Sequence, residues 1–153
     1  MGAKSLIRPA ADLYDEDFVL WIAQTARLLR AARFDEIDVE HLIEEIEAMA
    51  GRDKREVLSR LTVIVQHLLK WQHQSRKRSR SWHATIVAQR AEIELLFEQS
   101  PSLRRALDAS VARAYRSAVA AAAAETGLPV HTFPRECPFS PEQILDQNFL
   151  PDR

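Results

Sequence analysis

The 153 residues are enough for one domain with a hydrophobic core of its own, and 46% hydrophobic and 28% charged residues are typical of a globular protein. A single cysteine, Cys137, excludes an internal disulfide, and only three glycines favour helices over tight-turned sheets. The formal net charge of −1 conceals eleven acids and three bases in residues 12–50 (−8), followed by two acids and ten bases in residues 51–90 (+8).

The acidic segment predicts two helices. Residues 1–11 carry no pattern and are expected to be flexible. Asp12 or Asp15 can cap a first helix that runs to about residue 33 with a regular apolar face. Asp38 can cap a second helix that ends near Ala50, and Gly51 then marks a C-cap or a kink.

A central helix follows and ends in a basic turn. Its apolar residues recur at steps of three and four, which places them on one side of a helix: Val57, Leu58, Leu61, Ile64, Val65, Leu68, Leu69 and Trp71. The turn after it holds four cations within five positions: Arg76, Lys77, Arg78 and Arg80.

Two further helices and a tail complete the predicted fold. Ser81 can cap a fourth helix that has Gln89 in the middle of its apolar stripe, and Ser100-Pro101 can begin a fifth helix that stops at Gly127. A proline-rich extended tail leads to a short last helix at residues 141–146, capped by Ser140. We expect an all-α, antiparallel bundle of four to five helices in a single domain, residues 1–153, with residues 128–153 packed on it as a tail.

Several blocks, none of them specific alone, follow one another along the chain: LYDEDF (13–18), RFDEID (33–38), HLIEEIEAM (41–49), HLLKWQ (67–72), RSRSW (78–82), QR (89–90), SPSLR (100–104), and ETGLP with the tail TFPRECPFSPEQILDQNFLP up to residue 151. Together they give the chain, over nearly its whole length, a resemblance to a bacterial family known only as domain of unknown function number twenty-nine. It implies an all-helical cytoplasmic domain and supplies no catalytic residue.

The sequence assigns no catalytic, cofactor-binding or metal-binding residue. Bundle di-iron sites use Glu-x-x-His pairs, and no histidine here has a glutamate three positions before it. A site shared between helices, such as Glu45 with His67, stays open. Cys137 has no following helix N-terminus to lower its pKa, and a small hydrophobe anchoring the tail is the favoured interpretation.

Two kinds of polar residue are candidates for a site. The basic turn (Arg76, Lys77, Arg78 and Arg80) is a candidate anion site, because arginines suit phosphate contacts. Its cations can equally cap the central helix or compensate the acidic second helix. Gln89 is a candidate buried polar residue, which could line a pocket or be a hydrogen-bonded core residue.

The leading hypothesis is a cytoplasmic protein-interaction or self-association module, with a protein partner or a dimer and without a cofactor. The alternatives are binding of nucleic-acid phosphates through residues 76–80 and a metal-dependent enzyme in the bundle core. The apolar runs at residues 18–23 and 118–124 are too short for a membrane span, so no membrane partner is expected.

Overall fold

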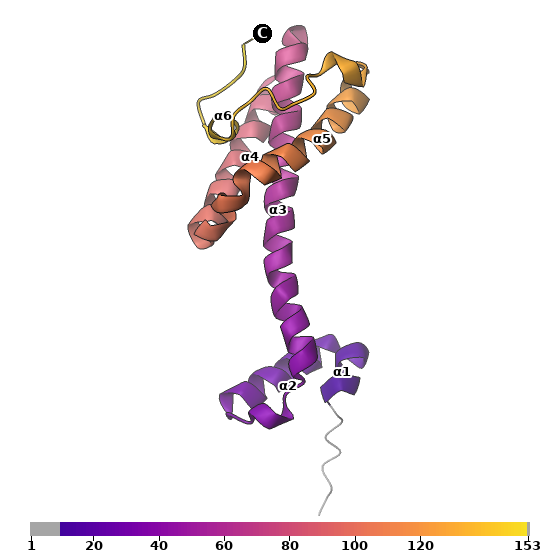
Figure 1. Cartoon of the computed structure of the whole chain (residues 1–153), viewed down its shortest axis with the longest axis vertical. Coiled ribbons are helices and arrows are strands. Elements are labelled where there is room, and N and C mark those ends of the chain that lie inside the picture. The colour runs from indigo at the N-terminus through magenta and orange to yellow at the C-terminus, as the bar shows by residue number, and fades with distance from the viewer. Residues whose placement is uncertain (1–9, 153) are drawn as a thin grey trace, which may run out of the picture. The chain divides into compact units, whose positions relative to one another are not determined.

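The structure is a computed structural model that describes residues 10–152, with side chains from Leu13 onward. The described chain is all-α and contains no strand, as predicted (Figure 1). Its helices are α1 (Ala10–Glu16), α2 (Phe18–Arg30), α3 (Val39–His73), α4 (Arg80–Gln99), α5 (Leu107–Thr126) and α6 (Pro141–Leu145). Short 3-10 helices lie between them: η1 (Phe34–Glu36), η2 (Ser75–Lys77), η3 (Pro101–Ala106) and η4 (Val130–Thr132).

The chain divides into two compact units. The first, called unit 1, ends at Gly51, and the second, called unit 2, begins at Arg52. The expectation of a single domain stays a prediction. The expected flexibility of residues 1–9 falls outside the described residues, whereas Ala10 already belongs to α1.

The predicted start of the first long helix was wrong. Asp12 and Asp15 both lie inside α1, and Asp17 caps α2 with an extended backbone and a side chain that accepts a hydrogen bond from the Leu20 amide at 3.0 Å. A helix start leaves its first amides without partners, and an aspartate oxygen satisfies one of them.

The predicted helix end with a C-cap at Gly51 is also wrong, because the second and central helices form the single 35-residue α3, whereas a kink at Gly51 stays a prediction. One glycine inside a helix costs only about 0.5–1 kcal/mol. Its neighbours include Met49, Ala50, Arg52 and Lys54, which are good helix formers and offset that cost.

Local capping shapes the C-terminal helices. Ser79, and not the predicted Ser81, caps α4 by accepting from the Trp82 amide at 3.2 Å. Pro101 begins a 3-10 helix in place of the predicted α-helical turn. Gly127, where the fifth helix was predicted to stop, is the C-cap of α5, with φ of 72°. The predicted capping box of Ser140 and Gln143 is confirmed at the start of α6.

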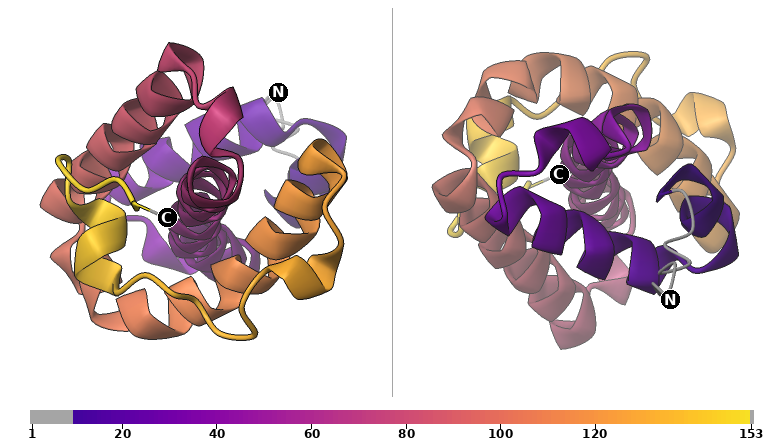
Figure 2. Two further views of the ribbon diagram at one scale, coloured as in Figure 1. Left: turned by 90° about the horizontal axis from the view of Figure 1, so that it is seen from above. Right: turned by 90° about the horizontal axis from the view of Figure 1, so that it is seen from below.

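The core of unit 2 gathers around the second half of α3. Viewed along α3, α4 and α5 flank this segment, and the C-terminal tail passes beside α4 (Figure 2). The tail contributes Phe133, Phe139 and Ile144 to the same core. The buried apolar residues from the three helices are Val57, Leu61, Ile64, Val65, Leu68, Leu69, Ile86, Ile93, Phe97, Val111, Ala114, Tyr115, Ala118, Val119 and Ala122.

A buried arginine on α4 fastens the tail. The Arg90 side chain is in a residue only 2% exposed, and its Nε donates to the Ile144 carbonyl at 2.7 Å. Its two terminal nitrogens donate to the carbonyls of Phe149 at 3.0 Å and Gln143 at 3.1 Å. One guanidinium thus satisfies three backbone acceptors around α6, where a helix end needs partners.

Arg90→Met should lower the free energy of unfolding by about 3 kcal/mol or more, because three carbonyls lose their donor and each unsatisfied buried group costs ~1–3 kcal/mol. Urea denaturation followed by circular dichroism measures this. The control is Arg104→Met, which removes an exposed ion pair to Glu94 at 3.0 Å and should cost less than ~1 kcal/mol. Equal losses in the two variants would contradict the anchoring role.

Candidate functional site

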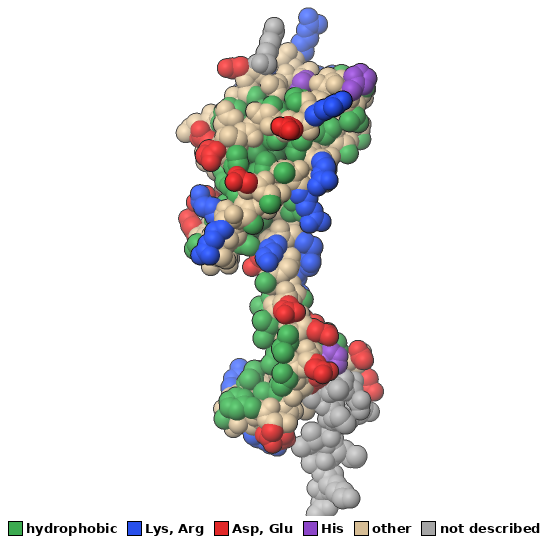
Figure 3. Space-filling view, in the orientation of Figure 1, with side chains coloured by type: hydrophobic (Ala, Val, Ile, Leu, Met, Phe, Trp, Pro, Cys, Tyr) green, Lys and Arg blue, Asp and Glu red, His purple; other side chains and the backbone are tan. Residues whose placement is uncertain are grey.

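Unit 1 leaves much of its apolar surface exposed. On α3, Val39, Ile43, Ile46 and Met49 follow one another at steps of four and three residues and are 50–59% exposed. Phe18, Ile22 and Leu29 of α2 are also more than 40% exposed. Figure 3 shows hydrophobic side chains gathered over α2 and the N-terminal half of α3. We call these seven residues the apolar surface of unit 1.

An aromatic cluster holds α1 and α2 against α3 inside unit 1. The Tyr14 ring stacks on His41 with centroids 3.9 Å apart and meets Trp21 edge-on at 5.0 Å. The Tyr14 hydroxyl donates to Glu45 Oε1 at 2.8 Å, and this hydrogen bond raises the pKa of Tyr14 to about 12. Because the cluster is fixed, the apolar surface is carried on an ordered support.

His41 is also held by Asp38, the residue before α3. Its Nδ1 lies 2.6 Å from Asp38 Oδ2, and this contact raises the pKa of His41 above its usual value. Burial alone would raise the pKa of Asp38, but the hydrogen bonds from the His41 side chain and backbone outweigh burial and lower that pKa. The pair therefore favours a charged imidazolium at the start of α3.

The basic turn divides into one structural cation and three free ones. Arg78 Nε donates to the Trp71 carbonyl in the last turn of α3 at 2.8 Å, and its guanidinium lies 5.3 Å from the Trp71 ring centroid. Arg76, Lys77 and Arg80 are exposed, and within the described chain none of them forms an ion pair. Arg78 thus caps the helix, while the other three remain available to an external anion.

Gln89 is half-buried and belongs to a charged cluster. Its Oε1 accepts from Arg60 at 3.1 Å, and Arg60 also contacts Glu56 at 2.7 Å and Glu92 at 3.6 Å. The buried polar residue of α4 is Arg90, which the sequence analysis missed. Its spacing could have indicated that it is buried, since position 90 falls four residues after Ile86 and three residues before Ile93 on the apolar stripe.

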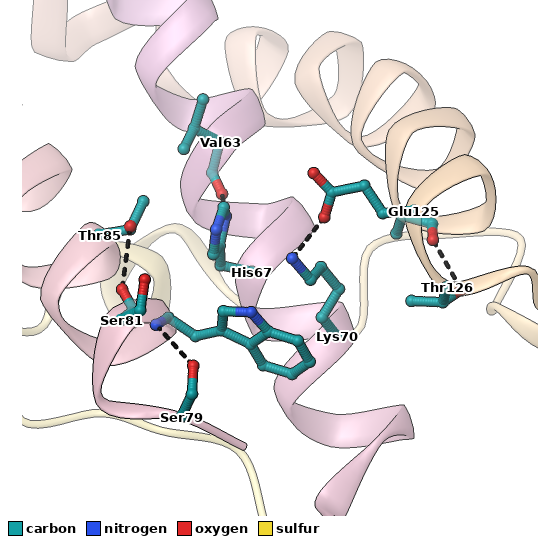
Figure 4. A network of polar contacts seen from close by, with 10 residues as sticks. Val63, His67, Lys70, Ser79, Ser81, Thr85, Glu125 and Thr126 are labelled. Atoms are coloured by element: carbon teal, nitrogen blue, oxygen red, sulfur yellow. Dashed lines mark hydrogen bonds and ion pairs between the residues drawn. The ribbon is translucent and has the colours of Figure 1, made fainter. Parts of the chain in front are cut away.

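Lys70 is a second buried cation that sequence analysis missed. Its ammonium donates to the Glu125 carboxylate, so α3 and α5 are joined by an ion pair (Figure 4). The same nitrogen lies 4.3 Å from the Trp82 ring centroid, within reach of a cation–π contact. The hydrogen bond from Lys70 lowers the pKa of Glu125. Lys70 is close to the basic turn in sequence, but its charge is paired with Glu125 and does not add to the candidate anion site.

The candidate metal ligands have other partners. Glu45 accepts from Tyr14, and His67 Nδ1 donates to the Val63 carbonyl at 2.8 Å, one turn before Lys70 (Figure 4). Among the residues that the structure describes, no group of three His, Cys, Asp or Glu side chains could hold a metal ion. Cys137 is half-buried, and burial raises the pKa of its thiol, which disfavours a thiolate nucleophile.

Comparison with known proteins identifies a family and no activity. The sequence model of the family described as Domain of unknown function DUF29 matches residues 13–150. No curated protein and no solved structure matches the chain. Among the described residues, no helix is long and apolar enough to cross a membrane.

Three histidines, His41, His67 and His73, should titrate on opposite sides of pH 6.5, the ordinary pKa of the imidazole. His41 should titrate above it, because of Asp38, and His67 and His73 below it, because of burial. NMR titration of the imidazole protons measures all three. Since the folded state holds the His41 proton more tightly than the unfolded chain, the pair contributes stability below pH ~6.5 that is lost as the pH rises through the raised pKa.

Asp38→Asn supplies the control for this titration. It should move the His41 pKa back toward 6.5 and leave those of His67 and His73 unchanged. A His41 pKa that does not respond to Asp38→Asn would contradict the role of this pair.

Proposed function

The chain belongs to the family Domain of unknown function DUF29, and we propose that it is a protein-interaction module of the cytoplasm. Its apolar surface of unit 1 docks an amphipathic helix of a partner protein, and the polar face of that helix carries lysines and arginines. The half-buried lone Cys137 suits a reducing compartment.

The distribution of exposed apolar side chains carries this proposal. Ten of the thirteen large hydrophobic side chains that are exposed in the described chain lie between Phe18 and Met49. Scattered single hydrophobics are normal on a protein surface, whereas their concentration on two helices marks an interaction site. Fully burying one Val, Leu, Ile, Phe or Met side chain contributes ~1.5–3 kcal/mol, so several of them can support a stable complex.

The charge of unit 1 supports a basic partner. Residues 13–51 contain ten acids and three bases, a net charge of −7. Glu40, Glu44 and Glu47 lie on α3 beside the apolar residues and are exposed. Cations flanking the apolar face of a partner helix would meet these carboxylates, and such complementarity gives specificity and fast association.

A second copy of unit 1 fits this surface less well. In a two-fold dimer the same patch meets itself, so the glutamates of one copy would face those of the other. Like charges across an interface cost free energy unless they are separated by solvent. The exposed Glu40, Glu44 and Glu47, which we call the acidic rim of unit 1, therefore favour a different, basic protein.

The proposal predicts binding of a labelled synthetic helix with leucines on one face and lysines on the other. Fluorescence anisotropy should show binding that weakens with salt, and a matched peptide with glutamates in place of lysines should not bind. Ile46→Ser combined with Met49→Ser should weaken binding roughly tenfold or more, because two half-exposed contacts are lost.

The matched control is Leu95→Ser with Val130→Ser, which removes side chains of similar exposure (51% and 60%) from unit 2. This control should bind as the wild type does. Equal binding by both double variants would overturn the docking site. A wild-type dimer that Ile46→Ser with Met49→Ser dissociates, measured by sedimentation, would replace the partner protein by a second copy.

Nucleic-acid binding is the second candidate, and the free cations of the basic turn favour it. Arg76, Lys77 and Arg80 project from a turn whose backbone Arg78 and the Ser79 cap fix in place. Residues 75–81 consist of serines and cations and contain no apolar residue. A phosphate backbone can neutralise such a group without any apolar anchor.

Anisotropy of labelled single-stranded RNA tests this candidate between about 50 and 200 mM salt. Three phosphate contacts should weaken affinity roughly 15–20-fold over that range, since each contributes a slope of about −0.7. Neutralising Arg76, Lys77 and Arg80 to glutamine should abolish binding. Neutralising the exposed Arg113, Arg116 and Arg135 removes the same charge and should leave it; equal losses, or no binding at low salt, would reject the candidate.

A further inference from the structure

A pocket in unit 2 is lined by two cations and no carboxylate. It encloses about 350 Å³ between the start of the unit 2 part of α3, the 3-10 helix η3 and the first turn of α5. That volume lies within the ~300–1,000 Å³ usual for small-molecule sites. The lining residues that matter below are Lys54, Val57, Ser102, Leu103, Arg105 and Ser110.

The polar side chains that line this pocket can all donate hydrogen bonds, and Arg105 also borders a neighbouring pocket that Asp108 and Glu142 line. Lys54 and Arg105 supply two cations, Ser102 and Ser110 supply two hydroxyls, and no aspartate or glutamate lines the space. Within residues 13–152, neither cation takes part in an ion pair or a side-chain hydrogen bond. The neighbouring Arg104, by contrast, is paired with Glu94 at 3.0 Å.

Three other cations of unit 2 have partners inside the protein, unlike Lys54 and Arg105. Arg60 and Lys70 of the same unit contact carboxylates, and Arg90 is satisfied by backbone carbonyls. Two exposed cations that line one pocket repel each other, and an anion bound between them relieves that repulsion.

We propose that this pocket binds the phosphoryl group of a small phosphate monoester. The guanidinium of Arg105 can form two parallel hydrogen bonds to phosphoryl oxygens, and the ammonium of Lys54 supplies a point charge. The serine hydroxyls can donate to the remaining oxygens. Buried Val57 and half-buried Leu103 provide an apolar wall for the organic part of the ligand.

This site is independent of the proposed docking function. All of its residues belong to unit 2, and none belongs to the apolar surface of unit 1 or to the basic turn. Failure of one proposal therefore leaves the other standing.

Isothermal titration calorimetry with phenyl phosphate tests the site on the full chain at physiological salt, where weak surface pairing is screened. We expect one site per chain. Lys54→Gln and Arg105→Gln should each weaken binding roughly tenfold or more, as expected for loss of hydrogen bonds from a charged donor. Inorganic phosphate should bind more weakly than phenyl phosphate, because it leaves the apolar wall unused.

Arg104→Gln is the matched control, since it removes an adjacent arginine that lies outside the pocket, and it should bind phenyl phosphate as the wild type does. Amide shifts in NMR spectra should map binding to Ser102, Leu103 and Ser110 and confirm that each variant is folded. No binding at millimolar ligand, or equal weakening by Arg104→Gln, would overturn the site. Benzoate binding as tightly as phenyl phosphate would overturn the phosphoryl assignment.

Discussion

Within unit 2, the packing of the C-terminal tail depends on one guanidinium that lies among uncharged hydrogen-bond acceptors. Arg90 contacts the carbonyls of Gln143, Ile144 and Phe149, and burial lowers its pKa to about 10, so it stays charged at neutral pH. Burying a cation is costly, and three charge-assisted hydrogen bonds offset that cost. The same hydrogen bonds hold the tail in place, and Phe139 and Ile144 of the tail complete the core around α3.

The second theme is which charges find partners inside the protein. Lys70, Arg78 and Arg90 are taken up by a carboxylate or by backbone carbonyls. Three cations of the basic turn, the cations of the pocket and the acidic rim of unit 1 are left for solvent or for ligands. The net charge of −1 is therefore a poor guide to this surface, where opposite charges are separated into patches.

Helix content and most apolar faces could be predicted because spacing alone determines which residues share a side. Helix boundaries could not be predicted, because neighbouring serines or aspartates are equally good caps by residue type. Only the folded backbone shows which one accepts the hydrogen bond, as Ser79 and Asp17 do. Gly51 was wrongly predicted to end a helix, because the free-energy cost of one glycine in a helix is small and the good helix formers around it offset that cost. The candidate sites were harder to predict. The sequence does not distinguish the helix-capping Arg78 from the exposed Arg76, and it does not show that Lys54 and Arg105, which are far apart in the chain, line one pocket.

The anchoring of the tail has a consequence for sequence divergence. Arg90 binds carbonyl oxygens, which every residue has, so side chains at 143 and 149 can change without removing an acceptor. These contacts depend instead on the spacing of the carbonyls along the chain. An insertion or deletion between residues 144 and 149 would move the Phe149 carbonyl away from the guanidinium. The contacts with Arg90 should therefore tolerate substitution there far better than a change in length, although the Gln143 side chain is still needed for the capping box of α6.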